Sequence, residues 1–325
     1  MLKFLILTFA TTVMLGFSNS SSAQTMNFPD RPVTIIVTLG AGGSSDIAVR
    51  LLANELSNIW NQSVIVTNRV GGGTVIGTTA IKNARPDGYT WGQISSSFLI
   101  NPSIRTNLPY DTIKDFKGLT LFVTQPNVLV AHPSFAPNTM KELVAESKKR
   151  TVTFTGGAEA SSGRLYGEMI SGITGIKWLH VPYAAMSPAI PDLLAGRVEL
   201  GMSGWPDLSA HIKSGRLKAI ALSYSRRIDE APELPTLMET YPEMEKMPYG
   251  SSIGLVLPIG VPENIVAKIS AGIKQAVASE SFKKKAMDLG MFPIYLTPTE
   301  TDEYIKDQVQ SWTKVIRGNN IIIKQ

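Results

Sequence analysis

The sequence contains no cysteine, so a structural disulfide and a metal site built on thiolates are both excluded. Histidine is also scarce. His132, His180 and His211 lie too far apart in the chain to form the paired spacing of a helical metal site, and we interpret them as structural. The sequence therefore predicts no metal and no other cofactor.

Beyond the N-terminus, no apolar stretch is long enough and free enough of charge to span a membrane. The N-terminus has Lys3, an apolar stretch from Phe4 to Phe17 and then Ser21-Ser22-Ala23, the order found in secretory signal peptides. A transmembrane anchor is the alternative, but the stretch is short for a span of about 20 residues. We expect cleavage between Ala23 and Gln24 and, since no disulfide can form, a bacterial periplasmic location.

Charge of one sign is not concentrated anywhere in the chain. The formal net charge is +5, and the short basic run Lys283-Lys284-Lys285 is typical of a solvated helix face. The composition therefore does not indicate nucleic-acid binding, and it favours anionic small molecules only weakly.

Two stretches imitate catalytic motifs but lack their context. Residues 250–254 match the nucleophile elbow of hydrolases, yet a loop is expected before Ser252, a strand after it, and no histidine follows His211. Residues 40–43 suggest a dinucleotide loop, but Ser45 stands where the third glycine is needed and no acidic residue ends the next strand. We therefore expect no catalytic residues, with a hydrolase or other enzyme on the same scaffold as the alternative.

The clearest pattern that is present runs from a strand through glycines into a helix. Val33 to Val37 is a β-branched run, residues 40–43 are rich in glycine, Ser44-Ser45-Asp46 supply capping chemistry, and apolar residues then recur at helical spacing to Ile59. Glycine lets the backbone approach a ligand, and a helix start presents N–H donors and partial positive charge. This order predicts an anion seat.

The same order recurs along the chain, with several further strands that end in loops rich in glycine and serine. Strands are predicted at residues 33–37, 64–67, 89–94, 119–123, 127–131, 152–155, 176–181, 198–202, 217–222 and 253–257. Met238 to Tyr249 has little periodicity and is predicted to be a loop. Alternating strands and helices indicate an α/β protein with ligand loops at the carboxyl ends of strands, and 325 residues leave room for two domains of about 150 residues each.

Many short motifs, in order and over nearly the whole chain, resemble one family. They include Arg31-Pro32, Gly42-Gly43-Ser44-Ser45-Asp46, Pro86-Asp87-Gly88-Tyr89-Thr90, Asn101-Pro102-Ser103, Leu108-Pro109-Tyr110-Asp111, His180-Val181-Pro182-Tyr183 and Asp192-Leu193-Leu194-Ala195-Gly196. They resemble the Bug-type solute receptors of tripartite tricarboxylate transporters. The resemblance implies a type II periplasmic-binding-protein fold of two lobes, each a mostly parallel sheet flanked by helices, with a cleft between them. It also implies a monomer that captures a small carboxylate and delivers it to a membrane permease.

Carried onto this chain, the resemblance implies a signal peptide at 1–23, one lobe from 24–125 plus 252–325 and another from 126–251, with crossovers near Gln125 and Ser252. The implied ligand-binding residues are Leu39, Gly42, Gly43, Ser44, Ser45, Ser95, Ser96, Ser97, Gly156, Ser161, Ser162, Arg164, Tyr183, Ser187 and Ser203.

Departures from the family pattern leave the ligand open among mono-, di- and tricarboxylates, amino acids and aromatic acids. Ala41 replaces a usual proline, Phe98 stands where a histidine often follows the serine run, and Ser203-Gly204 replaces an Asp-Asn pair. Phe98 and Trp205 lie on loops expected to face the cleft, where they either stack on an aromatic acid or only pack.

Two charged residues have two interpretations each. Asp46 either contacts a ligand amine or complements the helix N-terminus, and the second role is favoured. Arg164 is either a bidentate clamp for a second ligand carboxylate or an arginine that is solvated or paired with Glu159 or Glu168.

Overall fold

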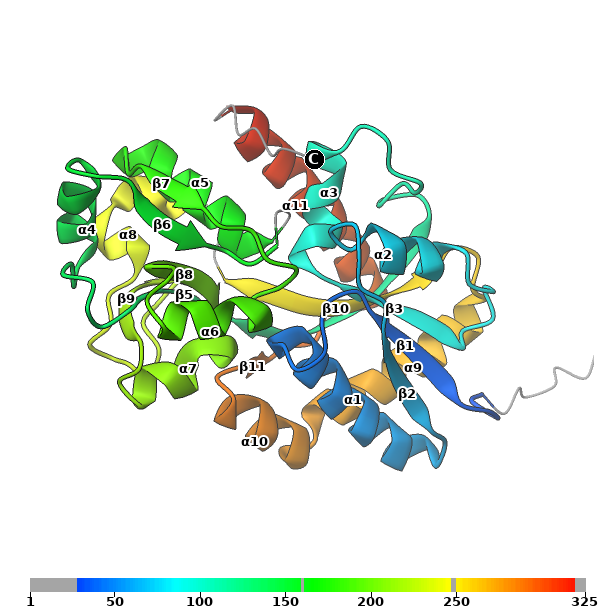
Figure 1. Ribbon diagram of the computed structural model, residues 1–325. Coiled ribbons are helices and arrows are strands. Elements are labelled where there is room, and N and C mark those ends of the chain that lie inside the picture. The colour runs from blue at the N-terminus through cyan, green and yellow to red at the C-terminus, as the bar shows by residue number, and fades with distance from the viewer. Residues whose placement is uncertain (1–27, 159–160, 247–249, 319–325) are drawn as a thin grey trace, which may run out of the picture.

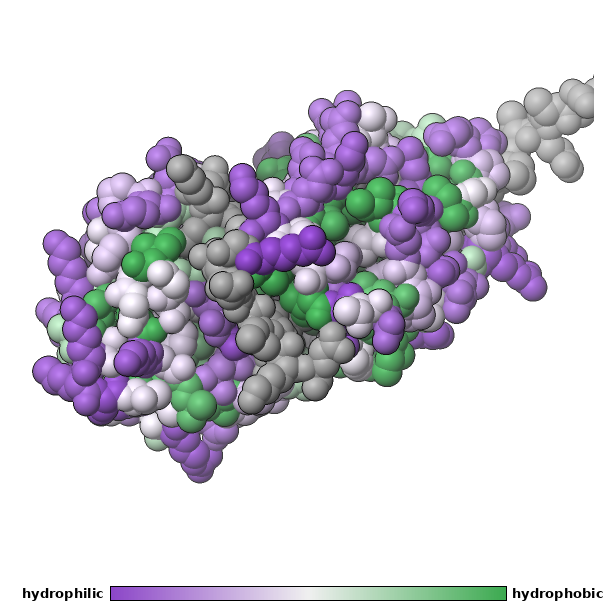
Figure 2. Space-filling view, turned by 90° about the horizontal axis from the view of Figure 1, so that it is seen from above, coloured by the Kyte–Doolittle hydropathy of each residue, from purple (hydrophilic) through white to green (hydrophobic). Residues whose placement is uncertain are grey.

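The computed structural model describes residues 28–158, 161–246 and 250–318. They form two lobes side by side, each with one β-sheet covered by helices (Figure 1). The expected signal peptide, its cleavage point and Glu159 lie outside these residues. No helix in the described ranges is long and apolar enough to cross a membrane. Hydrophilic residues dominate the face shown in Figure 2, and hydrophobic residues form small separate patches there.

The first sheet has six strands in the order β11-β4-β10-β3-β1-β2. Their bounds are β1 Val33–Val37, β2 Val64–Asn68, β3 Thr90–Ile94, β4 Phe116–Gln125, β10 Ser251–Pro258 and β11 Phe292–Pro293. The second sheet has five strands in the order β7-β6-β8-β5-β9. Their bounds are β5 Asn127–Ala131, β6 Val152–Thr155, β7 Trp178–His180, β8 Leu200–Gly204 and β9 Lys218–Ser223.

Both sheets are mixed, whereas mostly parallel sheets were expected. Strand β1 pairs in parallel with β2 and β3, and β6 pairs in parallel with β7 and β8. In contrast, β10 runs antiparallel to β3 and β4, β11 antiparallel to β4, and β5 antiparallel to β8 and β9. The antiparallel strands include the segments that pass between the lobes. An apolar run in the sequence reveals burial but not strand direction.

The chain passes between the sheets at two neighbouring points. Strand β4 ends in the first sheet at Gln125, and β5 begins in the second at Asn127. The return passage is at Gly250, whose N–H donates to the carbonyl of Ser223 at 2.9 Å just before β10 begins. Gln125 and Ser251 are paired across β4 and β10, so the two passages lie side by side.

Helices cover both sheets. In the first lobe they are α1 Ser44–Trp60, α2 Val75–Lys82, α3 Ser96–Ile104, α9 Glu263–Ala278, α10 Glu280–Asp288 and α11 Pro298–Gly318. In the second lobe they are α4 Met140–Ser147, α5 Ser162–Thr174, the 3₁₀ turn η1 Ser187–Ala189, α6 Ile190–Leu194, α7 Trp205–Lys213, α8 Leu237–Thr240 and η2 Pro242–Lys246.

Helix α1 forms where the sequence pattern predicts it, because its apolar stripe is buried. Val49, Leu52 and Leu56 are all 0% exposed, and α1 packs against α9. Burying such a side chain contributes about 1.5–3 kcal/mol. The helix ends at Asn61, whose φ of 48° is left-handed. The packing of this stripe fixes the direction in which the start of α1 points.

Some helices were not expected. The serines 95–97 were predicted to end a strand, but Ser95 caps α3 and Ser96 opens it. Pro102, inside α3, cannot donate a backbone hydrogen bond and hides the helix from sequence patterns. The region from Met238, expected to be a loop, holds α8 and η2, while residues 247–249 lie outside the described ranges.

Candidate functional site

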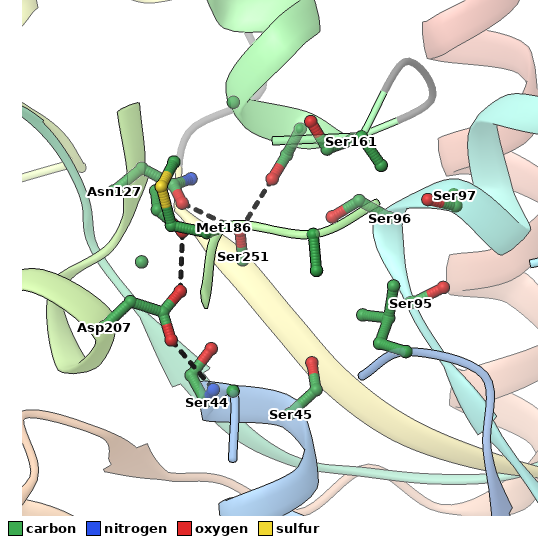
Figure 3. Close-up of a pocket in the computed structure, with 18 of the residues that line it drawn as sticks. Ser44, Ser45, Ser95, Ser96, Ser97, Asn127, Ser161, Met186, Asp207 and Ser251 are labelled. Carbon is green, nitrogen blue, oxygen red and sulfur yellow. Dashed lines mark hydrogen bonds between the residues drawn. The ribbon is translucent and has the colours of Figure 1, made fainter. Parts of the chain in front are cut away.

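A cavity of about 110 Å³ lies between the two lobes (Figure 3). The loops and helix starts that follow β1, β3, β6 and β8 form most of its wall, together with the ends of the crossover strands. It is lined by Leu39, Gly40, Gly43, Ser44, Ser45, Ser95, Ser96, Ser97, Gln125, Asn127, Gly156, Ala158, Ser161, Ser162, Gly163, Ala185, Met186, Ser187, Ser203, Gly204, Asp207, Ser251, Ser252 and Ile253. A concave space with polar groups from both lobes suits a small molecule.

The first wall is the loop between β1 and α1. Gly42 has a φ of 79°, a conformation that suits glycine, and its N–H donates to Oδ2 of Asp46 at 2.9 Å. Asp46 also accepts hydrogen bonds from Arg50 and from Asn68. Burial opposes its ionisation, but these hydrogen bonds outweigh burial and lower the pKa of Asp46. Asp46 therefore fixes the loop within its own lobe, which agrees with the favoured structural interpretation.

The second wall is the start of α3. The Oγ of Ser95 accepts the N–H of Phe98 at 3.3 Å, so Ser95 is the N-cap and Ser96 and Ser97 form the first turn. All three serines line the cavity. Phe98 does not, because its fully buried ring packs edge-on against Phe116.

The third wall is the start of α5 in the second lobe. The Oγ of Ser161 accepts the N–H of Arg164 at 3.1 Å and donates to the carbonyl of Gly156 at 2.5 Å. A Cβ at Gly156 would lie 2.0 Å from the backbone nitrogen of Arg164, so only glycine permits this contact between loop and helix. The next hydroxyl, on Ser162, lies 3.3 Å from the Oγ of Ser251 in β10.

The starts of α1, α3 and α5 therefore converge on one small space. Their first turns supply N–H groups and the positive end of each helix dipole, and the lining residues add several hydroxyls. Lysine and arginine are absent from the described residues that line the cavity. The arrangement is suited to bind a small anion by hydrogen bonds rather than by a cationic side chain.

Polar residues at the crossovers and in α7 that were not expected at the site also line the cavity. The Nε2 of Gln125 donates to the Oγ of Ser44 at 3.1 Å, and the Oγ of Ser251 donates to Oδ1 of Asn127 at 3.1 Å. Asp207 accepts the N–H of Ser44 at 2.8 Å. The expected crossovers near Gln125 and Ser252 could have indicated Gln125, Asn127 and Ser251, since polar residues at a crossover lie between the lobes.

Three residues expected at the site do not line the cavity. Gly42 is not part of the lining, and its positive φ lets the chain turn between β1 and α1. The side chain of Arg164 is 11% exposed and pairs with Glu168, one helical turn further along α5, which is the alternative considered for it. The hydroxyl of Tyr183 donates to Asp192 at 2.6 Å, and burial together with this contact raises the pKa of Tyr183 to about 12.

Two further side chains lie away from the cavity. Trp205, 2% exposed, packs in the core of the second lobe, so neither it nor Phe98 is placed to stack on a ligand in the cavity. Burial, together with the nearby Arg164, lowers the pKa of His180 to about 3, so this imidazole is neutral at physiological pH. Across the described ranges, no group of three or more histidine, aspartate or glutamate side chains is arranged to hold a metal ion.

Two α/β lobes that are joined by neighbouring segments, with a small cavity between them that both lobes line with hydroxyl groups, define a bilobal solute-binding protein. This chain belongs to the family of tripartite tricarboxylate transporter receptors, TctC, whose model matches residues 48–321. The family to which the sequence motifs point and the expected two-lobed fold are thereby confirmed. The family consists of solute-binding receptors, and the enzyme alternative has no support in it.

Individual relatives and solved structures support the same family assignment. Protein BugT of Bordetella pertussis strain Tohama I is 32% identical over 314 residues, which is 95% of each chain. The structure of the periplasmic binding protein BugD has a TM-score of 0.85 at 29% identity and covers 91% of this chain and 99% of its own. The structure of Rpa4515 from R. palustris with adipate has a TM-score of 0.84 at 25% identity, with the same coverage of both chains.

Proposed function

We propose that this protein captures a small organic carboxylate in the cavity between its lobes and delivers it to the membrane permease of a tripartite tricarboxylate transporter. The observation that carries the proposal is the convergence of three helix starts and many hydroxyls on a cavity whose described lining holds no lysine or arginine. Backbone N–H groups and hydroxyls at helix starts are sufficient to bind one carboxylate. The solved complex of Rpa4515 with adipate supports the same ligand class.

Within this proposal, the ligand contacts come from both lobes. In the first lobe they are the starts of α1 and α3, with Leu39, Gly43, Ser44, Ser45 and Ser95 to Ser97. In the second they are Gly156, Ser161, Ser162, Ser187 and Ser203. Arg164 and Tyr183 do not contact the ligand in this proposal. They stabilise the second lobe through the ion pair with Glu168 and the hydrogen bond to Asp192.

Ligand binding closes the lobes in this account. We take the lobes as 24–125 plus 252–325 and 126–251, hinged at the two neighbouring passages. A ligand that touches both lobes only in the closed form shifts the equilibrium towards it. The receptor acts as a monomer in the periplasm after cleavage between Ala23 and Gln24. Periplasmic location is consistent with the description of its relative BugD.

Calorimetry with succinate, malate, adipate and citrate tests the proposal. At least one of these acids should bind the wild-type protein and be recovered unchanged, because a receptor performs no chemistry. Ser45→Ala removes one lining hydroxyl and should weaken binding about three- to tenfold, the range of a single neutral hydrogen bond. The matched control is Ser225→Ala, which changes an exposed serine that does not line the cavity and should bind as the wild type does. Failure of these four acids and of the amino and monocarboxylic acids tested below to bind, or recovery of a converted product, would contradict the proposal.

A further inference from the structure

Asp207 occupies a place that the sequence does not reveal. It lies in the first turn of α7 in the second lobe and lines the cavity. Its carboxylate points across to the start of α1 in the first lobe (Figure 3). Its Oδ1 accepts the N–H of Ser44 at 2.8 Å, and its Oδ2 accepts the Oγ–H of Ser203 at 2.6 Å. Donors from both lobes therefore hold this carboxylate at the cavity wall.

The charge of Asp207 has no cationic partner in the wall. Among the described residues that line the cavity, it is the only aspartate or glutamate, and lysine and arginine are absent. Desolvation raises the pKa of Asp207, and the hydrogen bonds from Ser203 and Ser44 offset this only in part. An ionised carboxylate accepts about four hydrogen bonds, so the bonds from Ser44 and Ser203 leave acceptor capacity open. A ligand that brings a cationic donor would fill that capacity and balance the charge.

We propose that Asp207 binds the ammonium group of the ligand, so that the protein prefers amino acids to the corresponding acids without an amine. The inference rests on the proposed function, because it assumes that the ligand carboxylate binds at the helix starts. Ser45, next to Ser44 in the first turn of α1, also lines the cavity, so a carboxylate seat adjoins Asp207. An α-amino acid carries its carboxylate and ammonium on the same carbon and therefore reaches both places at once. An ionised carboxylate placed against Asp207 would be repelled instead.

Two series of acids that differ at a single substituent test this inference by calorimetry. L-aspartate, L-malate and succinate carry an ammonium, a hydroxyl and a hydrogen at the same carbon, and L-alanine, L-lactate and propionate repeat the comparison on a shorter chain. In the series that the cavity accommodates, the amino acid should bind the wild-type protein at least tenfold more tightly than the unsubstituted acid, with the hydroxy acid between them. A charge-assisted hydrogen bond supports a difference of about 10- to 100-fold.

Asp207→Asn keeps the size of the side chain and an oxygen for the Ser44 N–H, but it removes the charge. The preference for the amino acid should fall at least tenfold in this variant, while the affinity for the unsubstituted acid stays the same or rises. Asp229→Asn, which changes an exposed aspartate of the same lobe, is the matched control and should keep the wild-type preference.

The wild-type measurements alone can overturn the inference if the variant does not fold. A wild-type protein that binds succinate or propionate at least as tightly as its amino counterpart overturns it and leaves the proposed function standing. The same conclusion follows if adipate or citrate binds and neither amino acid does. Binding of no carboxylate at all contradicts both proposals.

Discussion

The helix starts on the two sides of the cavity are capped in different ways. Helix α5 carries its own cap, since Ser161 accepts the N–H of Arg164 from within the same lobe. Helix α1 begins after Gly43, which has no side chain to cap it, and the N–H of Ser44 is bonded to Asp207 of the other lobe.

This difference assigns different roles to the two lobes. The N-cap of α5 lies within its own lobe, so we expect it to persist whether the lobes are open or closed. The start of α1 gains a carboxylate only when Asp207 or a ligand reaches it. If the lobes close as proposed, we expect closure to be coupled to α1 more than to α5, because a contact made only in the closed state is what stabilises that state.

The glycines beside the two helix starts should respond very differently to an added methyl group. Gly156→Ala places a Cβ 2.0 Å from the backbone of Arg164, and we expect a loss of about 3 kcal/mol in the free energy of unfolding. Gly43→Ala is the matched substitution beside α1. Its φ is −79°, and its Cβ would lie 3.7 Å from the nearest atoms, so stability should change by less than about 0.5 kcal/mol. Urea unfolding of both variants measures the contrast, and equal losses would show that the two loops are packed alike.

The pH dependence of stability should reveal the contribution of Asp207 to the free energy of unfolding. Burial raises its pKa in the folded protein, so its contribution to stability is fully present below the pKa of an unfolded aspartate and is lost as the pH rises through the folded pKa. The wild-type protein should therefore lose stability relative to Asp207→Asn as the pH is raised from about 3 to 7, by about 1.4 kcal/mol for each unit by which the pKa is raised. Thermal unfolding of both proteins across this range provides the comparison. A difference that is constant, or that grows in favour of the wild type, would contradict the assignment.

Removing each cap should separate stability from lobe closure. Ser161→Ala deletes the cap of α5 and should cost about 1 kcal/mol of unfolding free energy without changing the distance between the lobes. Asp207→Ala deletes the contact between the lobes and should increase the radius of gyration of the ligand-free protein. Small-angle scattering together with unfolding measurements distinguishes the two effects. An Asp207→Ala protein as compact as the wild type would show that this contact does not hold the lobes together.

Most of the cavity wall is predictable because its signals are local. A β-branched run, a loop with glycine or serine and a helix start follow one another directly at residues 33–59 and 152–162. The carboxyl ends of neighbouring parallel strands lie at one edge of a sheet, so such loops meet. Local signals therefore indicate the loops that follow residues 37 and 155, and the family resemblance points to Ser44, Ser45 and Ser162 within them.

The remaining contacts depend on where side chains turn after the chain has folded. Asp207 resembles an ordinary acid in the first turn of a helix, and the donor it meets, Ser44, is 163 residues away in the sequence. Arg164 turns along α5 to Glu168, although it follows the serines by only two positions. Strand direction was missed for the same reason, since the pairing of β4 with β10 joins distant parts of the chain.

A crystal structure of the protein purified with its natural ligand tests the central claim most directly. We predict closed lobes and a carboxylate whose oxygens accept hydrogen bonds from the N–H groups and hydroxyls at the starts of α1, α3 and α5, with no lysine or arginine in contact. A ligand without a carboxylate, or one held by an arginine or lysine side chain, would contradict it.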